Sequence, residues 1–105
     1  MIKNLGVWVN KYTPALVREA QLSYNDLSSI DALDRFKEMR KIYANNNYIT
    51  KVRLSLDRLE ILELASNALI AVPNLAAMPR LKVLNLVRNK IKSIDVDFLP
   101  LTNSL

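Results

Sequence analysis

The chain has 105 residues, half of them hydrophobic, and its 15 Lys and Arg against 10 Asp and Glu give a formal net charge of +5. This length and apolar fraction suffice for one domain with a core shared along the chain. The chain has no His, no Cys and a single glycine, Gly6. This composition excludes the usual neutral-pH base, the common nucleophile–base pairs, most zinc sites, disulfide frameworks and glycine-rich phosphate loops.

From residue 17 onward, one short pattern occurs four times. It consists of an apolar or small residue, a variable residue, another apolar or small residue, two variable residues, Asn, a variable residue, and Leu or Ile. The asparagines are Asn25, Asn47, Asn67 and Asn89, so the first and third intervals are equal and the second is slightly shorter. Self-similarity at such a period is typical of a solenoid, in which each unit packs against its neighbours.

Residues 1–16 precede the first complete unit and have two interpretations. In one, the segment is the tail of a degenerate repeat. Counting back from Asn25, Leu27 and Ile30 by the interval that separates Asn25 from Asn47 reaches Lys3, Leu5 and Trp8. Alternatively, the segment is an N-terminal cap in which Trp8 and Tyr12 pack over the first strand. The sequence leaves both interpretations open.

Residues 17–105 are predicted to form a repeat array of four units, 17–38, 39–58, 59–80 and 81–105. In the third unit Leu62 and Leu64 alternate with Glu63, so a short strand directs both leucines inward and Glu63 outward. We expect parallel strands centred near Gln21, Tyr43, Glu63 and Asn85. The predicted core contains Leu22, Leu62, Leu64, Leu84, Leu86 and the four asparagines.

The segments that return the chain between strands differ in length. In the first unit, apolar residues at 30, 33, 36 and 39 step by three, which predicts a short helix or 3₁₀ turn. The second return segment, residues 52–59, is two residues shorter than the third, residues 72–81.

The pattern resembles leucine-rich repeats of the 22-residue subclass, and residues 59–78 (LEILELASNALIAVPNLAAM) look like one complete unit. Repeats of the type-1 protein phosphatase regulatory subunit, an axonemal dynein light chain and a spliceosomal adaptor are similar. The resemblance implies an α/β fold, a right-handed curved horseshoe fragment. Short parallel strands lie on its concave side and helical or 3₁₀ turns on its convex side. It also implies a scaffold or regulatory subunit that holds a globular domain or an amphipathic helix in the concavity.

The outward residues of the strands and the turns after them are the candidate partner-binding site. The candidates are Glu19 and Tyr24; Lys41, Tyr43 and Asn45; Ile61 and Glu63; and Val83, Asn85, Val87 and Arg88. Two columns cross the strands, one made of Glu19, Lys41, Ile61 and Val83 and the other of Ser23, Asn45, Ala65 and Val87.

These columns predict a strand face that is polar in its N-terminal half and apolar in its C-terminal half. An exposed apolar patch is typical of a protein interaction site, and Tyr and Arg at its margin are common binding hot spots. The alternative is that small apolar residues simply suit parallel strands. We expect a protein partner, with no catalytic residues, metal or cofactor.

A nucleic-acid role is the alternative function. Lys51, Arg53 and Arg58 on one return segment, with Arg80 and Lys82 on the next, could align as a basic edge stripe that binds phosphates without reading sequence. Association could also be indirect, through a ribonucleoprotein partner. Candidate aromatics for base stacking are limited to Tyr24 and Tyr43.

Features outside the repeats predict location and assembly. The longest apolar runs, such as residues 69–72, are too short to span a bilayer, and residues 1–9 do not resemble a signal peptide. We therefore expect a cytoplasmic protein, or a nuclear one, with no membrane partner. Phe98, Leu99 and Leu101 follow the fourth unit without a recognisable cap, so self-association through uncapped ends is also expected.

Overall fold

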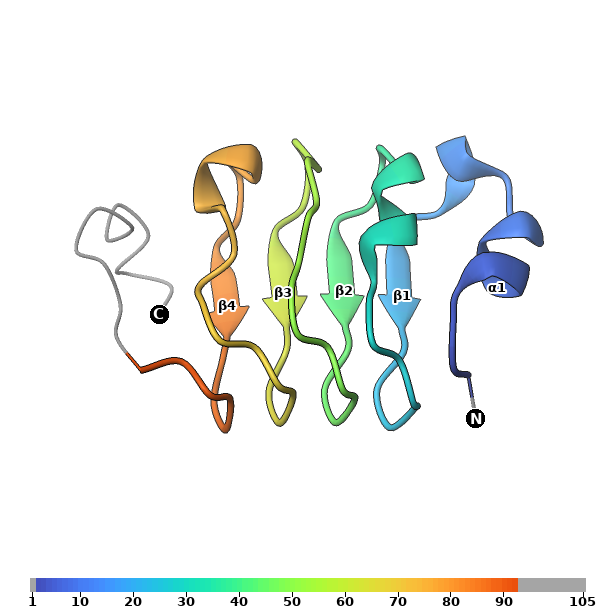
Figure 1. The fold of residues 1–105 in the computed structure, drawn as a ribbon. Coiled ribbons are helices and arrows are strands. Elements are labelled where there is room, and N and C mark those ends of the chain that lie inside the picture. The colour runs from blue at the N-terminus through green and yellow to red at the C-terminus, as the bar shows by residue number, and fades with distance from the viewer. Residues whose placement is uncertain (1, 93–105) are drawn as a thin grey trace.

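A computed structural model describes residues 2–92 as a row of parallel strands connected by return segments (Figure 1). The strands β1 (Glu19–Gln21), β2 (Lys41–Tyr43), β3 (Ile61–Glu63) and β4 (Val83–Asn85) form one parallel sheet in the order β1-β2-β3-β4. This architecture confirms the predicted solenoid. Each strand ends at the residue that the sequence placed at its centre, so the predicted centres are one residue late.

The core lies on one side of this sheet because alternate strand residues point inward. Leu22, Leu62 and Leu64 are fully buried and Leu84 is nearly so, as predicted. Leu86 is only partly buried against the same cluster. The buried inward positions explain why the sequence repeats Leu, Ile or Ala there, since these side chains fill the space between sheet and return segments.

The repeated asparagines connect neighbouring units. The Asn67 amide nitrogen donates to the carbonyl oxygens of Ala44 at 2.9 Å and Leu64 at 3.1 Å, while its oxygen accepts the N–H of Ile49 at 3.0 Å. These bonds satisfy backbone groups at a turn that would otherwise lack partners. The predicted structural role is confirmed. All four asparagines were predicted to be buried, but only Asn47 is. The other three are half-buried, because their amides form hydrogen bonds to turn backbone at the edge of the core.

The return segments differ in structure, and the 3₁₀ turn that the sequence predicts in the first is present. The first contains the 3₁₀ helix η2 (Asp31–Arg35), and Leu33, Phe36 and Met39 are fully buried on its inner side. The third contains the shorter 3₁₀ helix η3 (Leu75–Ala77), where the Asn74 side chain accepts the N–H of Ala76. Residues 50–56 of the second return carry no helix.

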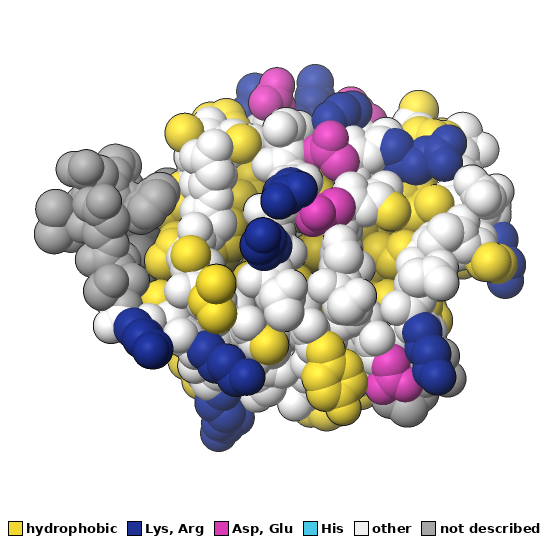
Figure 2. All heavy atoms as spheres, viewed as in Figure 1, with side chains coloured by type: hydrophobic (Ala, Val, Ile, Leu, Met, Phe, Trp, Pro, Cys, Tyr) yellow, Lys and Arg dark blue, Asp and Glu magenta, His cyan; other side chains and the backbone are white. Residues whose placement is uncertain are grey.

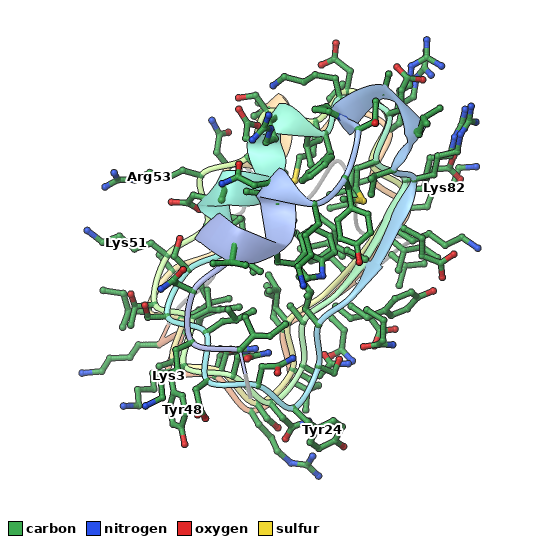
Figure 3. The ribbon with its side chains drawn as sticks, turned by 90° about the vertical axis from the view of Figure 1, so that its right-hand side faces the viewer. Lys3, Tyr24, Tyr48, Lys51, Arg53 and Lys82 are labelled. Carbon is green, nitrogen blue, oxygen red and sulfur yellow. The ribbon has the colours of Figure 1, made fainter. Side chains whose placement is uncertain are left out.

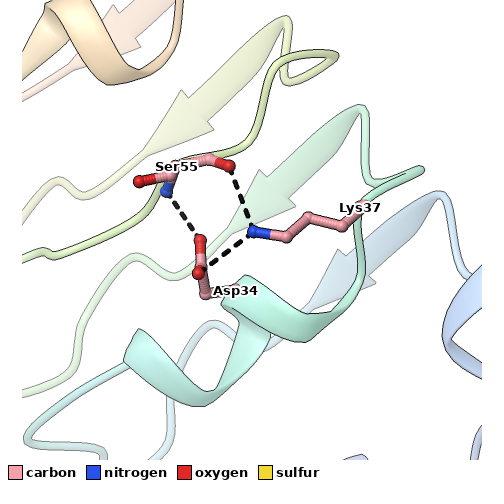
Figure 4. A network of polar contacts seen from close by, with 3 residues as sticks. All are labelled: Asp34, Lys37 and Ser55. Atoms are coloured by element: carbon pink, nitrogen blue, oxygen red, sulfur yellow. Dashed lines mark hydrogen bonds and ion pairs between the residues drawn. The ribbon is translucent and has the colours of Figure 1, made fainter.

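Side chains of η2, and Lys37 shortly after it, bond to the second return segment (Figure 4). The backbone N–H groups of Arg53 and Ser55 donate to the carboxylates of Asp31 at 2.8 Å and Asp34 at 2.6 Å. Lys37 Nζ donates to Asp34 Oδ2 at 3.1 Å and to the Ser55 carbonyl at 3.3 Å. Partial burial acts to raise the pKa of Asp34, but the Ser55 N–H and the Lys37 ammonium outweigh it and hold the pKa below its ordinary value.

The N-terminal segment packs against the first unit. It contains α1 (Gly6–Asn10) and the 3₁₀ helix η1 (Pro14–Leu16). Leu5 and Val9 are buried in the common core. The Trp8 ring stacks edge-on against Phe36 at 5.8 Å and lies 4.9 Å from the Tyr12 ring.

Hydrogen bonds show how the start of the chain fits the repeat. The Ile2 N–H donates to Asn25 Oδ1 at 2.9 Å, just as Leu27 donates to Asn47 Oδ1 at 3.0 Å. The Ile2 carbonyl also accepts from Asp26 as the Leu27 carbonyl accepts from Tyr48. Ile2 therefore occupies the position of Leu27 one unit earlier, whereas the interpretation of residues 1–16 as a degenerate repeat aligned Leu5 with Leu27.

The prediction of an uncapped C-terminal end falls on Phe98, Leu99 and Leu101. These residues, and the last part of unit 81–105, lie outside the described residues.

No membrane-spanning helix was expected from the sequence. In residues 2–92 no helix is long and apolar enough to cross a membrane.

Candidate functional site on the strand face

The sheet register brings the predicted outward residues into columns. Glu19 pairs with Lys41, Lys41 with Ile61 and Ile61 with Val83, so these four residues cross the sheet in one line. The next outward line consists of Gln21, Tyr43, Glu63 and Asn85. Both lines lie on the side opposite the buried leucines, which we call the strand face.

The outward residues of the strand face change from charged to apolar along the solenoid. Glu19 and Lys41 are exposed in the first two units, whereas Ile61 and Ala65 are half-buried in the third. In the fourth unit Val83 is 40% exposed and Val87 is 58% exposed. Apolar surface therefore reaches solvent on the third and fourth units, as the columns predict.

Part of the polar half is occupied by hydrogen bonds within the sheet. The Asn45 side chain accepts the N–H of Ala65 at 2.8 Å and donates to Glu63 Oε1 at 3.0 Å. The Asn45 N–H donates to Ser23 Oγ at 3.1 Å. These contacts fix Asn45 and Glu63 in place and satisfy much of their hydrogen-bonding capacity. They are consequently poorer candidates for direct partner contacts than the sequence indicated.

Each strand is followed by a turn residue with a left-handed backbone. Tyr24, Asn46, Ser66 and Arg88 have φ angles of 60°, 59°, 57° and 57°. This conformation is uncommon for residues other than glycine and asparagine. It repeats because the N–H groups of Tyr24, Asn46 and Ser66 donate to the neighbouring unit's carbonyl oxygens at 2.8–2.9 Å. Two candidate site residues, Tyr24 and Arg88, thus stand on fixed turns at the rim of the strand face.

Tyr24 is the most exposed aromatic residue among the candidates. Its side chain is 72% exposed and extends from the turn edge of the solenoid (Figure 3). Tyr43 is half-buried within the sheet. The two tyrosines therefore offer different contacts, one at the rim and one on the face.

Four charged residues border the strand face where the strands begin, and the sequence analysis did not identify them as a group. We call them the charged row. They are Arg18, Arg40, Glu60 and Lys82, which occupy equivalent positions in successive units. Glu60 lies between two cations, with Arg40 Nη1 at 3.3 Å and Lys82 Nζ at 3.7 Å. Backbone hydrogen bonds also connect these residues. The Arg40 N–H donates to the Arg18 carbonyl, the Glu60 N–H to the Arg40 carbonyl, and the Lys82 N–H to the Glu60 carbonyl. The charged row could have been predicted from the sequence, because its residues have the same spacings as the four repeated asparagines.

The predicted basic edge stripe does not form. Lys51 and Arg53 extend from one side of the solenoid, and Lys82 extends from the opposite side (Figure 3). Arg58 lies 3.7 Å from Glu38, and Lys82 pairs with Glu60. Figure 2 shows Lys and Arg side chains in separate places on the face in view, with acidic side chains among them. Lys51 and Arg53 follow the turn at Asn47, whereas Lys82 directly precedes β4, so these cations lie at opposite ends of their return segments.

The acidic side chains do not assemble into a metal site within residues 2–92, where no three of them lie together. The strand face consists instead of exposed valines, a fixed polar network and rim residues on rigid turns. This arrangement can contact another protein's surface through apolar side chains and position a few polar groups around them.

Comparisons with known proteins agree with this geometry. Residues 57–102 match the family model for leucine rich repeats in two copies. Podocan of Mus musculus is 36% identical over 105 aligned positions, covering 90% of this chain and 17% of Podocan. The Arabidopsis thaliana homologue of the protein phosphatase 1 regulatory inhibitor subunit PPP1R7 is 31% identical over 91 positions, covering 84% of this chain and 27% of that protein.

The chain thus spans less than a third of the length of either relative. No solved structure matches it. Its repeated asparagines, its parallel sheet and the family match together place the chain in the leucine-rich repeat family.

Proposed function

We propose that the chain is a non-enzymatic interaction module, a scaffold or regulatory subunit that holds a protein partner against its strand face. The observation that carries the proposal is the exposure of Val83 and Val87 beside Ile61 and Ala65. Exposed apolar side chains on a rigid sheet gain free energy when a partner removes them from water. A globular domain or an amphipathic helix has the complementary surface.

The residues around this patch supply specificity. Tyr43 lies in the neighbouring outward line, and Arg88 stands on the turn that follows β4. Both residue types combine a large contact area with hydrogen-bonding groups, which makes them frequent hot spots.

The relatives supply one defined partner to test. The Arabidopsis relative is named as a regulatory inhibitor subunit homologue of protein phosphatase 1. The catalytic subunit of that phosphatase is therefore the first purified protein to titrate against the chain, followed by partners captured with the chain as bait.

The test compares substitutions on two sides of the molecule. With any partner so found, Tyr43→Ala, Val83→Glu and Arg88→Ala should each weaken binding by about 1 kcal/mol or more. The control is Lys92→Ala, which alters an exposed side chain outside the strand face. Isothermal titration calorimetry measures the affinities, and circular dichroism checks that each variant remains folded.

Two results would contradict the proposal. Equal weakening by the control would mean general charge attraction, as would an affinity that falls steeply with salt, the behaviour of phosphate binding. Unchanged affinity in all three strand-face variants would place the partner elsewhere on the chain.

A further inference from the structure

A groove lies on the return side of the solenoid, away from the strand face. Residues 50–53 of the second unit form one wall and residues 70–74 of the third unit form the other, enclosing about 340 Å³. We call it the return groove. It is separate from every residue used in the proposed function.

The short second return segment explains why the groove exists. Having no 3₁₀ helix, this segment directs the N–H groups of Arg53 and Ser55 toward Asp31 and Asp34 of the first unit. No backbone hydrogen bond joins residues 50–56 to residues 70–76, both within the described part of the chain. The second return is therefore bonded to the unit before it and leaves a gap toward the unit after it.

The lining of the groove is mainly apolar. Ile70 is 65% exposed, Val52 and Val72 are half-buried, and Pro73 is buried. An isoleucine exposed to this extent beside a concave surface gains free energy when an apolar side chain covers it.

Two cations also belong to the lining. Lys51 and Arg53 are both exposed and extend from the same side of the solenoid (Figure 3). Neither side chain belongs to an ion pair within residues 2–92. Asp31 lies beside Arg53, where its carboxylate accepts the Arg53 N–H. The groove lining itself contains no acidic residue.

We propose that the return groove binds an extended acidic peptide segment, with one aliphatic side chain in the groove and carboxylates paired with Lys51 and Arg53. Charge complementarity selects an acidic ligand because two exposed cations adjoin a lining without acids. The apolar part of the lining selects a peptide over a nucleic acid, since the lining has no aromatic side chain on which a base could stack.

The probe is a fluorescein-labelled nine-residue peptide with a central Leu flanked on each side by four Asp or Glu residues. Fluorescence anisotropy measures its affinity for the full chain, and amide chemical shifts of the ¹⁵N-labelled chain locate the contact. We expect shifts concentrated in residues 50–53 and 70–74. A peptide with Ser in place of the Leu, and a nine-nucleotide oligothymidylate, should each bind about fivefold more weakly or worse.

Variants separate the groove from general attraction. Arg53→Glu and Ile70→Asp both change exposed side chains, so the fold should survive, and each should weaken peptide binding by about fivefold or more. The matched control Arg18→Glu makes the same substitution on an exposed residue of the charged row, whose member Lys82 extends from the side opposite Arg53 (Figure 3), and should change affinity less than about twofold.

The outcomes decide the proposal. Absent binding, shifts confined to the strand face, or equal loss with Arg18→Glu would overturn it. Equal affinity for the Ser peptide would remove the apolar anchor from the argument and overturn it as stated. Tighter binding of the oligothymidylate would assign the cations to phosphate recognition instead.

Discussion

Asn47 is 5% exposed, and its amide connects two units of the solenoid. Its nitrogen lies 3.0 Å from the Leu22 carbonyl and 3.2 Å from the Ala44 carbonyl, and its oxygen accepts the Leu27 N–H at 3.0 Å. A buried backbone group that loses its partner costs about 1–3 kcal/mol, more than the roughly 1 kcal/mol that an average hydrogen bond contributes. Single side chains at the turns therefore hold neighbouring units together.

Replacing this side chain tests that role. Asn47→Ala should lower the free energy of unfolding by about 2–4 kcal/mol, because at least two buried backbone groups lose their partner. Urea denaturation provides the measurement, with Thr50→Ala on an exposed residue as the control. A loss no larger than the control's would mean that water or local shifts replace the amide.

The left-handed turn before each asparagine gives a second test at the same scale. Ser66 has a φ of 57°, a conformation that asparagine tolerates and β-branched residues do not. Ser66→Val should destabilise the fold by about 1–2 kcal/mol, whereas Ser66→Asn should be neutral or slightly stabilising. Thermal unfolding of the two variants checks this order. The reverse order would show that side-chain packing, not backbone conformation, limits this position.

At the scale of elements, the second return segment depends on its neighbour. It is too short for the 3₁₀ turn found in the first and third units, so its backbone N–H groups need other partners. Asp31 and Asp34 stand three apart on η2, on one side of a 3₁₀ helix, and meet N–H groups two apart in an extended segment. The two periodicities match across the unit boundary.

This contact predicts a pH dependence. The pKa of Asp34 is lowered in the folded chain, so its stabilising contribution is present above the unfolded pKa and is lost as pH falls through the folded pKa. Between about pH 5 and pH 2 the wild type should therefore lose more stability than Asp34→Asn. The difference should be small, because the carboxylate is 39% exposed and screened by water.

Urea denaturation at a series of pH values measures the effect, with Asp57→Asn in the turn of the same return segment as the control. Parallel stability curves for the wild type and Asp34→Asn would show that the contacts of the Asp34 carboxylate with Lys37 and Ser55 contribute no pH-dependent stability.

At the scale of the whole molecule, stability is distributed along a row of units. Each strand pairs only with its neighbours in sequence, as the order β1-β2-β3-β4 requires. Such molecules are stabilised by contacts within units and between adjacent units. A core position therefore matters in proportion to how completely its neighbours enclose it.

Two leucines at the same position of the repeat test this gradient. Leu64 is fully buried and Leu86 is partly buried. Leu64→Ala should cost about 2–5 kcal/mol, and Leu86→Ala should cost clearly less because less surface returns to water. Chemical denaturation of the two variants gives the comparison. Equal losses would show that the fourth unit is enclosed as tightly as the third.

Most of the fold was predictable from the repeat. The asparagine spacing located four parallel strands, the alternation around Glu63 indicated which residues point inward, and steps of three predicted η2. The outward columns followed from the same spacing, because a parallel sheet in register aligns equivalent residues. These features depend on local periodicity and on burial, which every unit repeats.

Only the tertiary structure decided how unequal positions are used. It separated Lys51 and Arg53 from Lys82, bonded Asn45 to Glu63, placed Ile2 in the position of Leu27, and directed the second return toward Asp31 and Asp34. Each of these contacts joins residues of different units whose side-chain directions depend on the path of a particular turn. Periodicity determines which face a repeated residue occupies, whereas the contacts of an irregular segment depend on the three-dimensional fit of its neighbours.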